Sequence, residues 1–203
     1  MNKKHIPNTT LICIDGNKNS DIKKAIDRTL SICSFDDCIE IFDEKINSVK
    51  EYNDYILYKL IDLNIKTSHI LIIQSDGWVV NPDIWSDEWL QYDYIGAPWA
   101  LDPSHRLQGF PNVTSKNNVG NGGFSLRSMK LFNSIQKFLN KNNSFTYPED
   151  AFICRLLRPY LEKEGIIFAT QEVASKFSVE NTLYSGQFGF HGKVTMRING
   201  FTL

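Results

Sequence analysis

An apolar stretch that stops at a polar turn is the feature that most constrains the fold of this chain. The run from Ile70 to Ile73 is followed at once by Gln74-Ser75-Asp76-Gly77. A short and fully apolar run is typical of a strand that is buried on both faces of its sheet. The sequence therefore predicts a strand that delivers Asp76 to the rim of an α/β sheet. Because Asp-Gly favours turns on its own, a simple turn is the alternative interpretation.

Helix-like and strand-like segments alternate through the first part of the chain. Strands are expected over Thr10–Asp15 and Cys38–Phe42, with a helix over Asp21–Ile32 between them, and a helix over Val49–Leu63 leads into the apolar run. This rhythm predicts an α/β fold with a Rossmann-like, mostly parallel central sheet and flanking helices. Pro98 indicates that residues 92–99 form an edge strand, because proline cannot donate to a neighbouring strand.

The composition is that of an ordinary globular domain. The 203 residues are 42% hydrophobic and 22% charged, which predicts one domain over residues 1–203. A net charge of -1 argues against nucleic acid as a partner. No apolar segment is long enough for a signal peptide or a membrane span, so a cytoplasmic protein is expected. The four cysteines, at positions 13, 33, 38 and 154, lack zinc-site spacing and are expected to be reduced.

The second part of the chain begins with a long polar segment. Ala100–Val119 has no periodic pattern, and such a segment is either an active-site lid or a surface insertion without a role. After it, Gly120–Arg127 is expected to open a helix over Ser128–Leu139. A further helix over Ala151–Glu164 and a strand over Ile166–Ala169 complete the expected elements.

Glu149 and Asp150 form an acidic pair where a helix is predicted to begin. An acidic pair at this end interacts favourably with the helix dipole, which is reason enough for its presence. The functional alternative is that one carboxylate caps the helix while the other acts as a general base toward a substrate hydroxyl.

Glycines surround two other candidate positions. Gly120-Asn121-Gly122-Gly123 lacks the lysine of a phosphate-binding loop and instead predicts a backbone that turns tightly and lets a ligand approach. His191 follows in the sequence Phe-Gly-Phe-His-Gly. It is interpreted either as a metal ligand or phosphate donor or as a structural histidine.

Five motifs stand in a fixed order along the chain. They are Gln-Ser-Asp-Gly at 74–77, Tyr-Ile-Gly-Ala-Pro-Trp at 94–99, Gly-Asn-Gly-Gly-Phe-Ser-Leu-Arg-Ser at 120–128, Pro-Glu-Asp at 148–150 and Phe-Gly-Phe-His-Gly at 188–192. In this order they resemble the DUF5672 group of bacterial and fungal glycosyltransferase-like proteins. More distantly, the layout resembles the GT-A glycosyltransferases.

The resemblance implies a division of labour within the single GT-A-like domain. Residues 1–99 would bind the nucleotide sugar, and residues 100–203 would bind the acceptor and carry out catalysis. Asp76 would be the last acid of a metal-binding motif, with His191 completing the shell of a Mn²⁺ or Mg²⁺ ion, and Glu149 or Asp150 would be the base of an inverting transfer. The residues expected at the donor are Asp15, Gln74, Ser75, Asp76, Gly77, Arg127 and Lys193. Those expected at the acceptor are Asn121, Gly122, Gly123 and Trp99.

One position departs from the GT-A pattern. Gln74 stands where the first aspartate of the metal-binding motif is expected, and a neutral amide is a weaker ligand for a hard cation. Two arrangements stay open: a metal held by Asp76 and His191, or no metal, with Arg127 and Lys193 neutralising the phosphates. The alternative for these two cations is ordinary solvated charge.

These expectations lead to one function and two alternatives. The leading hypothesis is a hexosyltransferase-like enzyme that moves a sugar from a nucleotide-sugar donor to a saccharide hydroxyl in bacterial surface polysaccharide synthesis, with peripheral membrane association left open. Of the tryptophans at 78, 85, 89 and 99, at most one is expected to stack on a sugar. The runner-up is a non-catalytic carbohydrate-binding or scaffold protein with a degenerate site. A metal-dependent phosphohydrolase ranks lower, because the four histidines are scattered.

Overall fold

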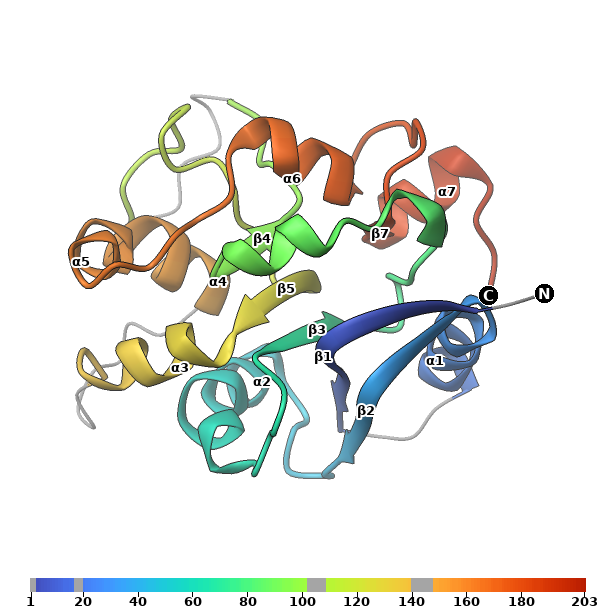
Figure 1. Cartoon of the computed structure of the whole chain (residues 1–203), viewed down its shortest axis with the longest axis horizontal. Coiled ribbons are helices and arrows are strands. Elements are labelled where there is room, and N and C mark those ends of the chain that lie inside the picture. The colour runs from blue at the N-terminus through green and yellow to red at the C-terminus, as the bar shows by residue number, and fades with distance from the viewer. Residues whose placement is uncertain (1–2, 17–19, 102–108, 140–147) are drawn as a thin grey trace.

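The computed structural model describes residues 3–16, 20–101, 109–139 and 148–203, which form a mixed α/β domain around one central sheet (Figure 1). The strand order in that sheet is β2-β1-β3-β5-β4. The strands are β1 (Lys4–Asp15), β2 (Cys33–Phe42), β3 (His69–Ile73), β4 (Tyr94–Gly96) and β5 (Phe124–Ser128). The predicted α/β class and the edge position of the strand before Pro98 are confirmed.

The sheet is less parallel in its pairing than the sequence pattern suggests. β1 pairs in parallel with β2 and β3, whereas β5 pairs antiparallel with both β3 and β4. β4 therefore runs in the same direction as β1, β2 and β3, and β5 is a single reversed strand inserted between β3 and β4. The expectation of a mostly parallel sheet did not include β5. It holds for the direction of the other four strands, but the pairs that β5 forms with β3 and β4 are antiparallel.

β5 lies where the sequence was expected to open a helix. Phe124 and Leu126 alternate with Ser125 and Arg127, which is the period of a strand. The two apolar side chains pack into the main core, while the polar ones face the other side of the sheet. The predicted helix begins one residue later as α3 (Met129–Gln136), where the Ser128 hydroxyl accepts a hydrogen bond from the backbone of the first turn.

Helices cover both faces of the sheet. The regular helices in the first and middle parts are α1 (Ser20–Ile32), α2 (Val49–Asp54), α3, α4 (Glu149–Ala151) and α5 (Arg158–Lys163). The helix predicted over 49–63 continues from α2 through a π-helical turn, Tyr55–Lys59, and a 3-10 turn, Leu60–Asp62. The helix predicted over 151–164 likewise contains a π-helical segment, Phe152–Leu157, ahead of Pro159. Proline donates no hydrogen bond to the preceding turn, which accounts for the break in regular α geometry there.

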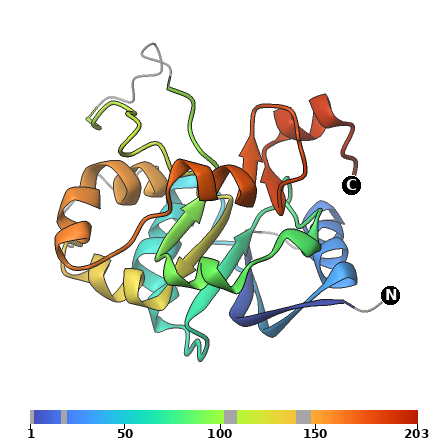
Figure 2. The ribbon, with the colours of Figure 1, turned by 45° about the horizontal axis from the view of Figure 1, so that its top comes forward.

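The region after residue 164 differs most from the sequence expectation. The strand predicted over 166–169 is a single bridge between Phe168 and Tyr94. The elements that the sequence did not predict are α6 (Gln171–Phe177), β6 (Ser178–Glu180), β7 (Gly189–His191) and α7 (Lys193–Asn199). β6 and β7 pair in parallel as a second small sheet, and Figure 2 shows this C-terminal part beside the central sheet.

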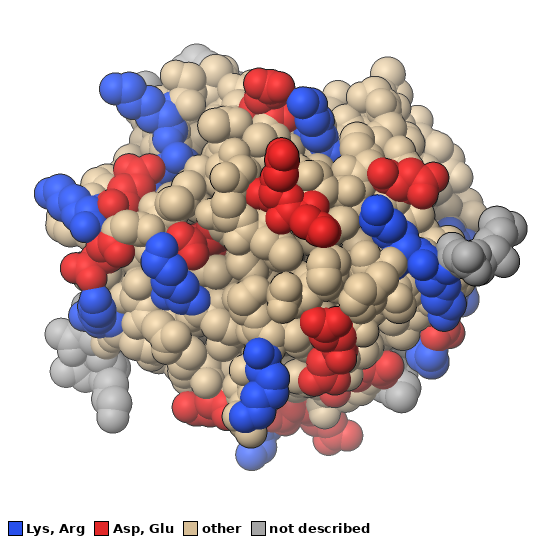
Figure 3. Space-filling model, in the orientation of Figure 1, with Lys and Arg blue, Asp and Glu red and all other residues tan. Residues whose placement is uncertain are grey.

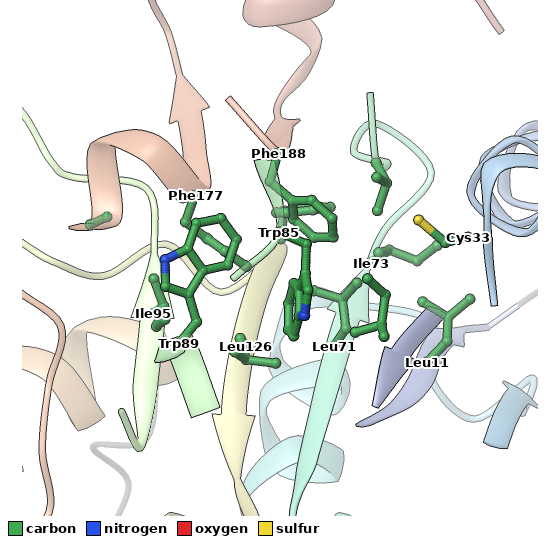
Figure 4. Close-up of a cluster of buried hydrophobic side chains, with 14 of the residues drawn as sticks. Leu11, Cys33, Leu71, Ile73, Trp85, Trp89, Ile95, Leu126, Phe177 and Phe188 are labelled. Carbon is green, nitrogen blue, oxygen red and sulfur yellow. The ribbon is translucent and has the colours of Figure 1, made fainter. Parts of the chain in front are cut away.

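Aromatic side chains join the C-terminal part to the main core. Trp85 and Trp89 pack edge to face on one another, and both contact Phe188 just before β7 (Figure 4). Trp78 packs on Phe190 in the same manner. Each buried ring of this size stabilises the fold by about 1.5–3 kcal/mol relative to an exposed one. Three of the four tryptophans are therefore core residues, and the fourth, Trp99, is half-buried.

Three further findings concern the described residues as a whole. None of their helices combines the length and the apolar character needed to cross a membrane. All four cysteines are free thiols, as expected. Lysine and arginine are interspersed with acidic residues on the face shown in Figure 3 and form no patch of a single sign there.

Candidate functional site

The candidate site lies at the edge of the sheet where β3 ends and β5 begins. Ile73, the last residue of β3, is paired with Phe124, the first residue of β5. Because the two strands run in opposite directions, the turn after β3 and the turn before β5 lie at the same edge. The polar residues 74–77 and 120–123 are thus brought together at this end of the sheet.

His191 connects the turn after β3 with the small second sheet. Its Nε2 atom lies 3.0 Å from the Gln74 side-chain oxygen and 3.3 Å from an Asp76 carboxylate oxygen. Its Nδ1 atom lies 3.0 Å from a carboxylate oxygen of Glu180. The backbone holds the same arrangement, because the Gly192 N–H donates to the Asp76 carbonyl at 2.8 Å. Asp76 and His191, predicted to act together, are in direct contact.

The two carboxylates around His191 favour its charged form. Burial acts to lower the pKa of the imidazole, but hydrogen bonds to Asp76 and Glu180 outweigh it and raise the pKa to about 9. For Asp76, burial acts to raise the pKa, and the hydrogen bond and charge of His191 lower it overall. An imidazolium between two carboxylates is therefore the form present at neutral pH in the absence of a ligand.

Side chains from other parts of the protein pack directly against the glycines of residues 120–123. A Cβ atom on Gly120 would overlap the Trp99 ring, one on Gly122 the Glu149 carboxylate, and one on Gly123 the His191 imidazole. Between them Asn121 adopts a positive φ of 62°, a conformation that asparagine tolerates better than most residues. The tight turn is present, and the groups that approach the glycines in this structure are Trp99, Glu149 and His191. The approach of a ligand to this turn stays a prediction.

Arg127 and Glu149 form a buried ion pair beneath this turn. Arg127 is fully buried and donates to both carboxylate oxygens of Glu149, at 2.8 and 2.9 Å. It also donates to Ser125 and to the Gly122 carbonyl. Glu149 is 3% exposed. The expectations that Arg127 meets a diphosphate and that Glu149 serves as a base do not fit this geometry, since each charge is enclosed and neutralised by the other.

Asp150 is the accessible member of the acidic pair. One of its carboxylate oxygens accepts from the Gly122 N–H at 3.1 Å, and the other accepts from the N–H of Ala151. Burial, and next the charge of Glu149, raise the pKa of Asp150 to about 6. A carboxylate with such a pKa is suited to accept a proton near neutral pH.

A pocket of about 910 Å³ lies next to Asp150. Asp150, Trp99, Arg155 and Glu180 are among the residues that line it. Glu180 also bonds to His191, so the pocket borders the Asp76 and His191 cluster. Part of the predicted lid over 100–119 lines it as well, through Ala100, Leu101 and Val113, whereas 102–108 lie outside the described residues.

The remaining predicted donor residues surround the cluster to different degrees. Asp15 ends β1, the parallel neighbour of β3, and is half-buried at the same edge of the sheet. Ser75 is half-buried in the turn, and Gly77 closes that turn by donating to the Gln74 carbonyl at 3.2 Å. Lys193 is exposed at the start of α7, and its charge contributes to lowering the pKa of Asp76.

Comparison with known proteins agrees with the order of the motifs. The family model described as "Protein of unknown function (DUF5672)" matches residues 31–191. The chain belongs to the DUF5672 family. No curated protein matches this DUF5672 chain.

Several solved chains match this DUF5672 chain, and one of them illustrates the shared fold. It is the crystal structure of a glycosyltransferase involved in the glycosylation of the major capsid of PBCV-1, with 13% sequence identity and a TM-score of 0.52. The likeness covers 94% of this chain and 95% of that one. At this identity the comparison shows that the DUF5672 chain has the fold of a glycosyltransferase.

Glu180 is the site residue of this DUF5672 chain that sequence reasoning missed. It stands in no recognised motif, and nothing predicted β6. Glu180 reaches the site because β6 and β7 pair in parallel with Glu180 and His191 as register partners. The signal was a short alternating segment, Ser178-Val179-Glu180, which is too brief to assign from a single sequence.

The residues around Asp76 partly fit a divalent cation. A carboxylate oxygen, an imidazole nitrogen and an amide oxygen converge there, and all three atom types coordinate Mn²⁺ or Mg²⁺. Within the described part of the chain, no three His, Cys, Asp or Glu residues are grouped so that they could hold a metal. A cation at this position would depend on Asp76, His191 and Gln74, with the remaining ligands from substrate and water.

Proposed function

We propose that this protein is a glycosyltransferase that moves a sugar from a nucleotide-sugar donor to a hydroxyl of a saccharide acceptor. The observation that carries the proposal is the position of the turn Asn121–Gly123, which lies between the Asp150 carboxylate and the contact of His191 with the Asp76 carboxylate. Asp150 is bonded to Gly122 on one side, and the His191 ring, which contacts Asp76, lies against Gly123 on the other. Glycosyl transfer requires one polar group at the leaving diphosphate and another at the attacking hydroxyl.

In the proposed reaction, Asp150 is the base. Its carboxylate accepts the proton of the acceptor hydroxyl while that oxygen forms a bond to C1 of the donor sugar. The bond between C1 and the diphosphate oxygen breaks, and the nucleoside diphosphate leaves with the bonding electrons. The product would have inverted configuration at C1. The buried pair of Arg127 and Glu149 positions Asp150 by fixing the start of α4 and the Gly122 carbonyl.

The donor is assigned to the edge formed by Asp15, the 74–77 turn and Lys193. The half-buried position of Asp15 and Ser75 and the exposed charge of Lys193 support this assignment. Asp76, His191 and Gln74 would hold a Mn²⁺ or Mg²⁺ ion, which when bound would neutralise the charge of the diphosphate. His191 would first have to lose a proton, because an imidazolium has no lone pair for a metal.

A donor panel tests the proposal without knowledge of the acceptor. Purified protein is incubated with a set of nucleotide sugars, with and without Mn²⁺, and the release of nucleoside diphosphate to water is measured. We expect slow hydrolysis of at least one donor, reduced at least about tenfold in Asp76→Asn. A folded sample that neither binds nor hydrolyses any donor would contradict the proposal. Surface polysaccharide synthesis in the bacterial cytoplasm is the setting proposed for this reaction.

Gln74 favours a second candidate, a non-catalytic carbohydrate-binding protein. Its amide contacts the same nitrogen of His191 that would face a cation. If this candidate is right, saccharides bind to the folded protein while nucleotide sugars neither bind nor react.

A further inference from the structure

The pocket beside Asp150 has two chemically different walls. One wall is apolar and aromatic and comes from the segment after β4, with Pro98, Trp99, Ala100 and Leu101. The other comes from α6, β6 and the loop between β6 and β7. Its uncharged polar residues are Gln171, Ser175, Ser178, Asn181, Thr182, Ser185 and Gln187. An aromatic ring together with amide and hydroxyl groups in one pocket suits a molecule with an apolar face and a polar rim.

Several polar groups of this wall are free to bind a ligand. The side chains of Gln171, Ser175 and Asn181 are exposed and make no hydrogen bond within the described part of the chain. Ser178 is only 1% exposed, and its buried hydroxyl likewise has no partner among the described residues. A buried hydroxyl without a partner is costly, which points to a ligand or water that supplies one.

The charges of the pocket disfavour an anion. Its charged lining residues in the described ranges are Asp150, Glu180 and Arg155. The Arg155 guanidinium donates to the Pro111 carbonyl from both Nε and Nη2, and it lies 5.9 Å from the centre of the Trp99 ring. Among the described lining residues, the one cation is therefore committed to the pocket wall. Of the two carboxylates, Glu180 is bonded to His191, whereas Asp150 accepts hydrogen bonds only from backbone N–H groups. A carboxylate or phosphate on the ligand would meet the negative charge of Asp150, and no described lining residue offers a free cation to offset it.

We propose that this pocket is the acceptor site and that it selects uncharged sugars over uronic acids and sugar phosphates. The sugar's apolar face lies on Trp99, and its hydroxyl groups bond to the amide and hydroxyl groups of the α6 and β6 wall. The identification of the bound sugar as the acceptor rests on the proposed function. The preference of the pocket for a neutral saccharide does not depend on it.

Two ligands that differ at one carbon test the preference. Binding of methyl β-glucoside and methyl β-glucuronide, and of the corresponding β-galactosides, is measured by ligand-observed NMR in the absence of any nucleotide sugar. We expect the neutral member of at least one pair to bind at least about tenfold more tightly than its uronate, a difference of about 1.4 kcal/mol. Equal or tighter binding of the uronates, or no binding of any of the four, would overturn the inference.

A charge added to the polar wall gives a second test that does not depend on removing a contact. Ser175→Arg places a free guanidinium at an exposed position of α6, so folding is not at risk. We expect this variant to bind the uronate at least about tenfold more tightly than the unmodified protein does, while Ser31→Arg, at an exposed position on α1, leaves uronate binding unchanged. The same gain in both variants would show that the uronate is attracted to net charge and not held in the pocket, and would overturn the inference.

The outcomes separate this inference from the proposed function. Hydrolysis of a nucleotide sugar together with a failure of all four saccharides to bind would refute the acceptor pocket alone. Neutral saccharide binding without hydrolysis or binding of any donor would refute the transferase alone.

Discussion

At the scale of single residues, neighbouring charged side chains of the site have different roles: some stabilise the fold in buried pairs, and others are placed to react with a ligand. Glu149 and Asp150 are adjacent in sequence, yet Glu149 is enclosed with Arg127 and Asp150 lines the pocket. The sequence identified the pair and could not tell the members apart, because the partner of Glu149 lies on a strand that was not predicted. The same strand explains why Arg127, assigned to phosphate from its motif, is not available to a ligand.

The raised pKa of Asp150 predicts the pH dependence of transfer. A base is active when deprotonated, so kcat/KM should fall about tenfold per pH unit as the pH drops below about 6. Asp150→Asn should lower kcat at least about a hundredfold, with an unchanged circular dichroism spectrum. Asp83→Asn, at an exposed position outside the pocket lining, is the matched control and should retain full activity. If kcat/KM does not fall as the pH drops below about 6, Asp150 is not the base.

The Arg127 and Glu149 pair predicts a large effect on stability. Glu149→Gln leaves a fully buried guanidinium without its counter-ion, and breaking such a pair typically costs about 3–5 kcal/mol. Glu172→Gln removes one partner of an exposed pair with Lys176 and should change the unfolding free energy by less than about 1 kcal/mol. Urea denaturation measures both. A similar small change in the two variants would show that the burial of the first pair has no energetic consequence.

At the scale of elements, the site is built where predicted and unpredicted pieces meet. The turn after β3 and the start of α4 were expected from apolar periodicity and from the acidic pair. The strand β5 was missed because the preceding glycines and the following helix pattern conceal five residues of alternation. β6, β7 and α7 were missed for a different reason. Such short segments are held by contacts with distant parts of the chain, such as the bond from Gly192 to Asp76, and not by local preference.

The glycine turn before β5 predicts a coupled loss of the His191 contacts. Gly123→Ala places a methyl group where the imidazole lies, so the ring must move away from Gln74 and Asp76. NMR titration should then show the pKa of His191 falling from about 9 toward 6.5. Gly165→Ala is the control, since its Cβ would meet open space and only the positive φ would cost about 1 kcal/mol. An unchanged His191 titration in Gly123→Ala would contradict the packing described here.

At the scale of the whole molecule, the two expected halves share one sheet. β5, from the second half, lies between β3 and β4 of the first. The division at residue 99 therefore marks proposed roles and not separate folding units. The alternation of helices and strands could be predicted from the sequence, because buried strands and amphipathic helices have clear periods. The way in which the two halves share the sheet could not, because strand pairing is set by contacts between distant residues.

The charged cluster around His191 predicts how stability varies with pH. Its pKa is raised from 6.5 to about 9 in the folded protein, so the stability that it contributes is fully present below pH 6.5 and is lost as the pH rises through about 9. Thermal unfolding should therefore show a decline in Tm between these pH values. His191→Asn should flatten that decline, whereas His5→Asn, at an exposed position, should not. A decline of equal size in all three proteins would place its origin elsewhere.

The glycines of the turn before β5 also bear on how chains of this family can change. Each has a counterpart far away in sequence whose size matches the space it leaves: Trp99 for Gly120, Glu149 for Gly122 and His191 for Gly123. A larger residue on one side can be accommodated only by a smaller one on the other. Substitutions at these positions should accordingly occur together among homologues. The damage caused by Gly120→Ala should likewise be suppressed when Trp99 is replaced by a residue with a smaller side chain.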